Sequence, residues 1–407
     1  MLKINKNISL LFVLVVFSML MEKMLQIYAV SALMSTIVLL CIVKNTNSAS
    51  SMHIMILIGF GVFIYSPAVL NGFFFDTSFQ LYFVTSFLVL LLLRKTEKCV
   101  DKLFEIKNTF FQILLIIYAG AFCLILMLDL KITIEYILGP LVLLLALSLR
   151  RGKNIENAIY ATFLFGLLFY FIIFEWEGFG RVVIFGNLIV GLIILMRVYE
   201  IHVRKTLFLV LTILGSLMMA SRDAIKADSL LTLAFLDDSA VGPYRLAVTF
   251  IDRYFYYGID LQGFFGQVIF TFLSFVPREI WPSKPYGFGF LYVLENMDQS
   301  LVLAGHSIAS TFIGDHFYFL GFWGLVSAYI MVMIISKIIN IVYRSNILCG
   351  SLYVLLSCNM MVLIWGGMTS FSARIIFPII GAIPLIILFH LLANYRNSLI
   401  KSQKLLA

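Results

Sequence analysis

Long apolar runs separated by short polar stretches fill almost the whole chain. Many of these runs reach about eighteen residues, enough for a helix to cross a hydrocarbon core of about 30 Å. The runs are continuous, whereas the strands of a membrane β-barrel would alternate apolar and polar positions. The pattern therefore predicts an all-α polytopic membrane protein. We expect about twelve transmembrane helices, at residues 8–22, 25–43, 52–70, 78–93, 109–128, 132–149, 157–174, 181–199, 206–220, 317–336, 347–366 and 372–392.

The composition agrees with this class. Hydrophobic residues make up 62% of the 407 residues and charged residues only 12%, and the mean hydropathy is +1.04. A soluble globular domain carries about 25% charged residues. The five cysteines show no metal-ligand spacing, so the sequence supports neither a zinc site nor a disulfide framework. We expect no metal and no cofactor.

The positive charges predict the orientation of the chain in the membrane. With the N-terminus inside, 19 of the 29 lysines and arginines fall in cytoplasmic segments, as the positive-inside rule requires. Glu22 and Lys23 follow the first apolar run in place of a small-residue cleavage site, so we expect a retained helix rather than a signal peptide. Both termini are then cytoplasmic. The predicted organisation is an N-terminal bundle over 1–220, a long external loop over 221–316 and a C-terminal bundle over 317–407.

The long loop is basic although it is external. It holds six of the ten outer basic side chains: Arg222, Lys226, Arg245, Arg253, Arg278 and Lys284. Arginine has a planar fork that suits two hydrogen bonds to phosphate, whereas lysine is a point charge. The excess of arginine indicates a site for an anionic, phosphorylated ligand at the membrane surface; the alternative is a solvated loop face. The position of these charges also argues against nucleic acid as a partner.

The segment FVPREIWPSKP, residues 275–285, holds three of the eight prolines of the chain. Proline fixes φ and pushes the residue before it toward extended geometry, so we expect a stiff, extended connector. The connector would hold Arg278 and Lys284 at the level of the lipid headgroups, where Trp281 also fits. The alternative is a simple helix terminator.

Other parts of the loop have helical patterns. The spacing of apolar residues predicts short helices over 223–236 and 244–257. On the second of these, Arg245 and Arg253 are two turns apart and share roughly one face. The apolar run 263–276 is too short to span a bilayer, so we expect a re-entrant or interfacial helix there.

Groups that could remove a proton follow the connector. His306 has a side chain that titrates near neutrality and is the expected general base, with Asp315 as the reserve. His316 is expected to cap or brace the next helix, and His306 too has the alternative of a helix cap or an interfacial hydrogen bond. Arg374 begins an apolar run at the outer face with no carboxylate within helical reach, and an ionisable residue at such a depth indicates a functional site.

The order of these elements resembles a known family. A basic residue just beyond a transmembrane helix (ASRD, 220–223) precedes the long loop, which ends in VPREIWPSKP and is followed by GHS and GDHFYFLGFWG. This order is similar to that of the Wzy-type O-antigen and capsular oligosaccharide repeat-unit polymerases of bacteria. The motifs cover about residues 220–325, and the rest of the chain matches only by hydropathy.

The resemblance implies a reaction and a setting. A glycan linked to undecaprenyl diphosphate is transferred to an acceptor repeat unit at the outer face of the bacterial cytoplasmic (inner) membrane. The enzyme would have a GT-C type fold and need neither metal nor nucleotide sugar. The implied partners are the lipid-linked oligosaccharide, the lipid bilayer, and the chain-length regulator and flippase of the same pathway. Catalysis is expected from His306, Asp315 and Arg278, and binding of diphosphate or glycan from Arg222, Arg245, Arg253, Lys284, Trp281, Arg374 and His316.

Two other functions stay open. An O-antigen ligase would use external arginines and a histidine on the same type of donor. A transporter, either a lipid flippase or a solute carrier, usually shows repeated halves and charged residues at the midplane of the membrane. In this chain the ionisable residues gather in one external loop and no repeat is visible, which favours the enzyme.

Overall fold

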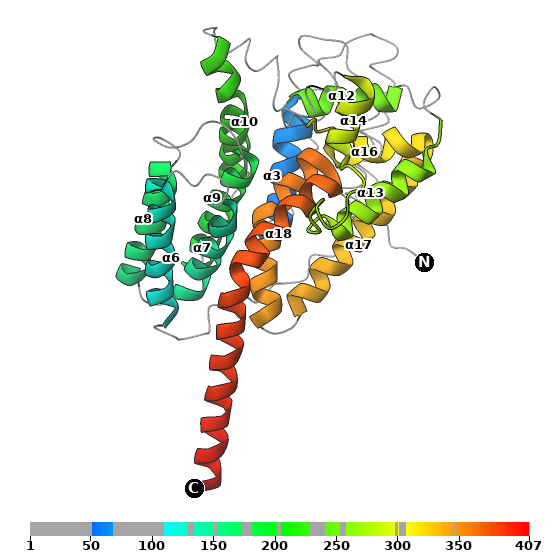
Figure 1. Cartoon of the computed structure of the whole chain (residues 1–407). Coiled ribbons are helices and arrows are strands. Elements are labelled where there is room, and N and C mark those ends of the chain that lie inside the picture. Colours follow the sequence, from blue (N-terminus) through cyan, green and yellow to red (C-terminus); the bar gives the residue numbers. More distant parts are fainter. Residues whose placement is uncertain are drawn as a thin grey trace, which may run out of the picture.

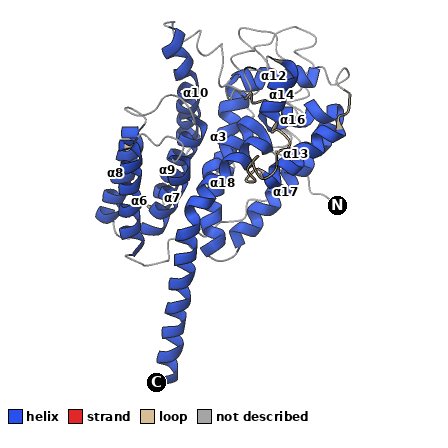
Figure 2. Ribbon diagram, viewed as in Figure 1, coloured by secondary structure: helices blue, strands red, loops and turns tan. Residues whose placement is uncertain are grey.

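The computed structural model describes residues 51–67, 110–128, 134–149, 154–171, 181–199, 201, 205–227, 241–252, 258–297, 300, 307–344 and 347–406. Within these ranges every regular element is a helix and there is no strand (Figure 2). The predicted all-α class is therefore confirmed for the part of the chain described. The transmembrane helices predicted at 8–22, 25–43 and 78–93 lie outside these ranges.

In the first half of the chain, the observed helices follow the predicted apolar runs. They are α3 (Ser51–Phe60), the π-helical turn η2 (Gly61–Tyr65), α6 (Phe110–Met127), α7 (Ile134–Ser148), α8 (Asn154–Tyr170), α9 (Arg181–Val198) and α10 (Lys205–Ala227). The last of these continues past the predicted end at residue 220, so Arg222 lies on α10 rather than in a loop.

The segment predicted as a long loop also contains helices. These and the helices that follow are α12 (Val241–Asp252), α13 (Leu261–Leu273), α14 (Phe288–Asn296), α16 (Thr311–Leu320), the 3-10 turn η6 (Gly321–Trp323), α17 (Gly324–Arg344) and α18 (Ile347–Leu406). The helices predicted at 244–257 and 263–276 correspond to α12 and α13. Most of the helix predicted at 223–236 lies outside the described residues. The helix predicted to start at 317 already begins at Thr311 and is bent at Gly321.

By length and composition, two helical segments in the described residues could cross a membrane: Thr311–Ile335, which is bent at Gly321, and Gly350–Leu388, which is interrupted at Gly367. Several shorter apolar helices accompany them, and these carry large apolar side chains on outer faces, for example Ile113, Ile116, Ile117 and Leu124 of α6. Exposure of such a surface to water would be unfavourable, whereas in a bilayer it contacts apolar lipid chains. The helices thus indicate a membrane protein.

The final helix, α18, is a hairpin of two limbs. Only Gly367 within it has non-helical dihedral angles, with φ 73° and ψ −171°. A side chain added at Gly139 of α7 would contact both Leu355 and Pro378, which lie before and after Gly367, so the two limbs run side by side. Figure 1 shows them as the orange and red parts of α18. The predicted helices at 347–366 and 372–392 leave a short outer loop between them, and that loop is wrong, because a single glycine, Gly367, makes the turn.

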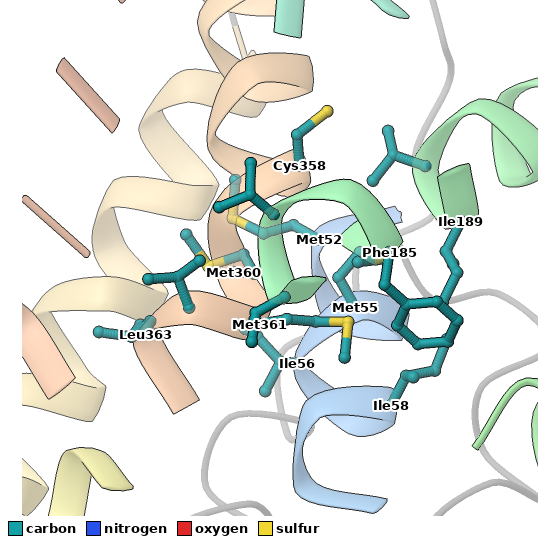
Figure 3. Close-up of a cluster of buried hydrophobic side chains, with 14 of the residues drawn as sticks. Met52, Met55, Ile56, Ile58, Phe185, Ile189, Cys358, Met360, Met361 and Leu363 are labelled. Carbon is teal, nitrogen blue, oxygen red and sulfur yellow. The ribbon is translucent and has the colours of Figure 1, made fainter. Parts of the chain in front are cut away.

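The first limb of α18 packs against α3 and α9 in a core rich in sulfur (Figure 3). Gly186 of α9 comes so close to the backbone of Cys358 that a larger residue would overlap its carbonyl oxygen. Unbranched methionines fill the irregular spaces that such close helix contacts leave. The labelled side chains are all buried: Met52, Met55, Ile56, Ile58, Phe185, Ile189, Cys358, Met360, Met361 and Leu363.

A cluster of aromatic rings joins α12, α14 and α16. Its members are Phe250, Phe288, Tyr292, Tyr318 and Phe319, with neighbouring ring centroids 5.0 to 6.0 Å apart. Aromatic pairs at such distances stabilise a fold beyond the apolar area that they bury. The hydroxyl of Tyr318 also donates to Glu295 Oε2 at 2.6 Å. The cluster fixes these three short helices as one packed unit beside the α18 hairpin (Figure 1).

Candidate functional site

The proline-rich connector after α13 consists of turns. The amides of Ile280 and Trp281 donate to Pro277 O at 3.2 and 3.1 Å, and the amide of Lys284 donates to Trp281 O at 3.1 Å. In the second turn Pro282 stands at the position where a fixed φ favours a turn. The expectation of an extended connector is therefore wrong for residues 277–284, because Pro277 begins the first turn and Pro282 lies within the second, and neither position needs a backbone donor.

Arg278 holds the far end of this connector. Its Nη1 donates to Lys284 O at 2.7 Å and its Nη2 donates to Pro285 O at 3.2 Å. The guanidinium carbon also lies 4.0 Å from the centre of the Tyr286 ring, in a cation–π contact. A guanidinium has five donors, so donors remain after the two contacts to backbone carbonyls.

Lys284 contacts the other end of the connector, where the chain leaves α13. Its Nζ donates to Ser274 O at 2.6 Å and to Val276 O at 2.9 Å, just past the last turn of α13, and lies 5.0 Å from the Phe270 ring centre. Cations near a helix C-terminus stabilise its unpaired carbonyls. Burial, with the side chain only 9% exposed, and repulsion from Arg278 lower the pKa of the Lys284 ammonium. Two like charges therefore share one small loop, an arrangement that a bound anion would relieve.

The connector and α13 present a largely apolar outer surface. Phe272 is 74% exposed and Ile280, at the tip of the connector, is 76% exposed. Trp281 is half-buried and its indole Nε1 donates to Ser283 Oγ at 2.9 Å. We use the name α13 stripe for the exposed apolar residues at helical spacing on α13, which are Leu261, Phe265, Val268, Ile269 and Phe272.

The inner face of α13 packs against the end of the connector, and that end of the connector packs against α18. Gln267 Nε2 donates to Tyr286 O at 3.0 Å. A side chain at Gly287 would contact Phe270 of α13 and, at 3.4 Å, Cβ of Thr369 in the second limb of α18. The connector and the turn of α18, which are far apart in the sequence, are therefore neighbours.

Asp315 is buried on α16 beside that turn. The hydroxyl of Ser310 donates to Asp315 Oδ1 at 2.6 Å. The second carboxylate oxygen lies against Gly367, where any side chain would overlap it. Next to Ser310, Thr311 has φ 63°, and a positive φ is an outlier for a β-branched residue. Strained backbone and a buried carboxyl group thus meet at one place.

His316, the next residue of α16, contacts other helices. Its Nδ1 is 2.8 Å from the hydroxyl of Ser327 on α17, and its ring lies 6.0 Å from that of Phe264. The contact with Ser327 is consistent with the expected bracing of the following helix, whereas Phe264 belongs to α13. His316 and Asp315, although adjacent in the sequence, do not form a joint acid–base site through any contact in this structure.

The remaining predicted site residues are more scattered. Arg374 lies on the second limb of α18 with its guanidinium carbon 5.1 Å from the Trp365 ring centre. Arg245 lies half-buried on α12. Arg222 is on α10, and nothing is described of its side chain. Arg253 and His306 lie outside the described residues.

The structure therefore joins Arg278 with Lys284, and Asp315 with the turn of α18. Sequence reasoning missed Ser310, Thr311, Gly367 and Thr369. The glycine pair at 366–367 was the only local signal, since glycines within an apolar run mark a break or a close approach. In the described part of the chain, no group of three or more His, Cys, Asp or Glu side chains could hold a metal ion.

Comparisons with known proteins add no relative from which a function could be transferred. The resemblance to oligosaccharide polymerases therefore stays a prediction from the quoted motifs. No family model, no curated protein sequence and no solved structure matches this chain.

Proposed function

We propose that this protein polymerises oligosaccharide repeat units carried on undecaprenyl diphosphate, as a glycosyltransferase at the outer face of a bacterial cytoplasmic membrane. The observation that carries the proposal is the connector between α13 and α14. It holds two cations, Arg278 and Lys284, in one rigid loop next to an exposed apolar helix face. A lipid diphosphate combines the two matching features, an anionic head and an apolar tail.

The proposed division of roles follows the chemistry of the transfer. The bond between the anomeric carbon and the diphosphate oxygen breaks, and the diphosphate keeps the electron pair. The hydroxyl oxygen of the acceptor sugar forms the new bond to that carbon, and its proton passes to His306. The positive charges of the loop stabilise the departing diphosphate. Remaining donors of Arg278, together with Arg222, Arg245, Arg253 and Arg374, would supply these contacts.

The membrane arrangement is part of the same proposal. About twelve transmembrane helices, both termini in the cytoplasm and the 221–316 segment outside would place the connector at the outer headgroups. The α13 stripe supports an interfacial position, because an amphipathic helix buries its apolar face at the acyl boundary. The tip of the connector, Ile280, would dip into the same layer while Trp281 stays at headgroup depth.

Deletion of the gene followed by analysis of the surface glycan tests the proposal. A polymerase predicts loss of the long glycan with retention of a single repeat unit. Accumulation of lipid-linked polymer with no attached glycan would instead identify a ligase. An unchanged glycan would overturn both, and would favour a transporter of another solute.

The role of His306 has its own test in purified protein. His306→Ala should slow glycan transfer by about two to four orders of magnitude, the usual contribution of a positioned general base. Binding of the lipid donor should change little, since the diphosphate contacts are assigned to arginines. The matched control is His316→Ala, which removes a bracing contact and should have a milder effect on transfer. Turnover equal to that of the unaltered protein in His306→Ala would exclude this histidine as the base.

A further inference from the structure

The hairpin turn of α18 depends on a contact from another helix. Gly367 has φ 73° and ψ −171°, a backbone region that only glycine adopts readily. Steric crowding also requires glycine here, because a side chain at this position would overlap the carboxyl group of Asp315. The carboxyl group of Asp315 therefore packs directly against the backbone of the turn at Gly367.

The carboxyl group is itself held in place from its own side. Ser310 donates to Asp315 Oδ1 at 2.6 Å, and both side chains are buried. Between them Thr311 has a positive φ, and Gly314 packs so closely on Ser310 that a side chain there would contact its Cβ at 2.9 Å. Residues in such strained conformations persist only where the surroundings fix them, and they gather at functional sites.

The same short segment is also tied to α14. The amide of Ile308 donates to Gly289 O at 3.3 Å, and α14 begins directly after the connector. Beyond the turn, Thr369 faces Gly287, the residue that precedes α14. The start of α14 therefore contacts both the second limb of α18, through Thr369, and the segment before α16, through Ile308.

We infer that Asp315 is a positioning residue that locks the turn of α18 to the connector, rather than a catalytic base. Its carboxyl group, braced by Ser310, fixes Gly367 and with it the start of the second limb. That limb carries Arg374, two helical turns further on. The inference that this geometry serves glycan transfer rests on the proposed function, whereas the lock itself does not.

Disulfide crosslinking in a variant without the five native cysteines measures the lock directly. Gly287→Cys with Thr369→Cys gives a reporter pair, because their Cβ atoms would be 3.4 Å apart, close to the spacing of about 3.8 Å in disulfides. Gly59→Cys with Ile364→Cys gives a control pair between α3 and the first limb of α18, with Cβ atoms 3.2 Å apart. Free thiols after mild oxidation are counted by a mass-tagged maleimide.

We expect Asp315→Ala to lower crosslinking of the reporter pair several-fold and to leave the control pair unchanged. Asp315→Asn should keep the reporter pair crosslinked, because an amide oxygen can still accept from Ser310. An unchanged reporter pair in Asp315→Ala would overturn the inference. If Asp315→Ala lowers crosslinking of both pairs, the whole protein is disturbed, and Ser310→Ala is the deciding variant because it removes only the hydrogen bond to Asp315. Unchanged crosslinking of the reporter pair in Ser310→Ala would then overturn the inference.

Activity then separates the positioning role from a catalytic one. A base at this position predicts that Asp315→Asn abolishes polymerisation, whereas a positioning residue predicts that Asp315→Asn retains it and Asp315→Ala loses it. The reporter disulfide should restore glycan length to Asp315→Ala. Inactivity of Asp315→Asn with normal crosslinking would overturn the positioning role. Normal surface glycan in the deletion strain would refute the proposed function and leave the crosslinking result standing.

Discussion

At the scale of single residues, the charged side chains of the connector act first on the protein itself. Arg278 reaches forward to two carbonyls and Lys284 reaches back to two others, so the loop is closed from both ends. Buried carbonyls left without a donor are costly, and cations satisfy them with strong hydrogen bonds. The three prolines add to this by limiting the conformations of the unfolded loop. The result is a preorganised loop.

Replacing Lys284 by Met tests the importance of the backward contacts. The variant keeps the apolar stem and removes both hydrogen bonds, to Ser274 O and Val276 O, so we expect a loss of about 1–3 kcal/mol in stability. Thermal unfolding in detergent measures it. Ser283→Ala is the control, since this exposed hydroxyl contacts only the Trp281 indole. Equal melting temperatures for the two variants would contradict the assignment.

The turn of α18 makes a second prediction at this scale. Gly367→Ala forces a side chain into a glycine-only conformation, which costs about 1–3 kcal/mol, and also into the Asp315 carboxyl group. We expect a lower melting temperature and less folded protein. Gly120→Ala is the matched control, because α6 leaves open space around that glycine. A Gly367→Ala variant as stable as Gly120→Ala would show that the turn has another geometry.

At the scale of elements, the short helices between α10 and α17 gain their stability from neighbours. An isolated helix shorter than about 12–15 residues is marginal in water, so α13, α14 and α16 need caps and packing. The aromatic cluster supplies the packing for α12, α14 and α16. For α13 the start is defined by Asp260, whose Oδ1 accepts from Gly263 N at 2.8 Å and whose amide donates to Phe319 O.

The cap of α13 can be tested by two substitutions of Asp260. Asp260→Ala removes the acceptor for Gly263 N and should destabilise the first turn by about 0.5–2 kcal/mol, whereas Asp260→Asn keeps a good cap. Hydrogen exchange at the Gly263 amide is the measurement. Faster exchange in the Ala variant alone is expected, and equal exchange in both variants would exclude the cap as the source of protection.

At the scale of the whole molecule, the α18 hairpin organises the described helices. Its first limb contacts α3 and α9, both limbs meet α7, and its turn meets α13, α14 and α16 (Figure 1). Close approaches at glycines make this possible: Gly186 lies against the backbone of Cys358, and Gly381 lies against that of Tyr136. In membranes, where apolar area does not drive helix association, such small residues allow tight packing.

Labelling of cysteines in intact cells tests the orientation of the molecule. In a variant without native cysteines, Ser283→Cys should react with an impermeant maleimide, because Ser283 is exposed on the connector and the connector is proposed to lie outside. Ser402→Cys should react only after the cells are permeabilised. Labelling of Ser402→Cys alone would invert the topology and place the cationic loop on the cytoplasmic side.

The sequence by itself determined the helical class and the positions of most described helices. Apolar runs such as 109–128 and 181–199 correspond closely to α6 and α9, because run length and the absence of polar interruptions are local properties. The cations of the connector, Arg278 and Lys284, and Asp315 itself were also identified from the sequence as candidate site residues. Their partners were not, since Lys284 could equally face a ligand or a carbonyl.

Only the tertiary structure decided how these residues are used. Turns replaced the expected extended connector because Arg278 and Lys284 bond to carbonyls several residues away. A single glycine replaced the expected loop between the helices predicted at 347–366 and 372–392, and Asp315, fifty-two positions earlier by residue number, occupies the space beside Gly367. Such contacts depend on which helices pack together. Hydrophobic periodicity specifies that a face is buried, but not which neighbour buries it.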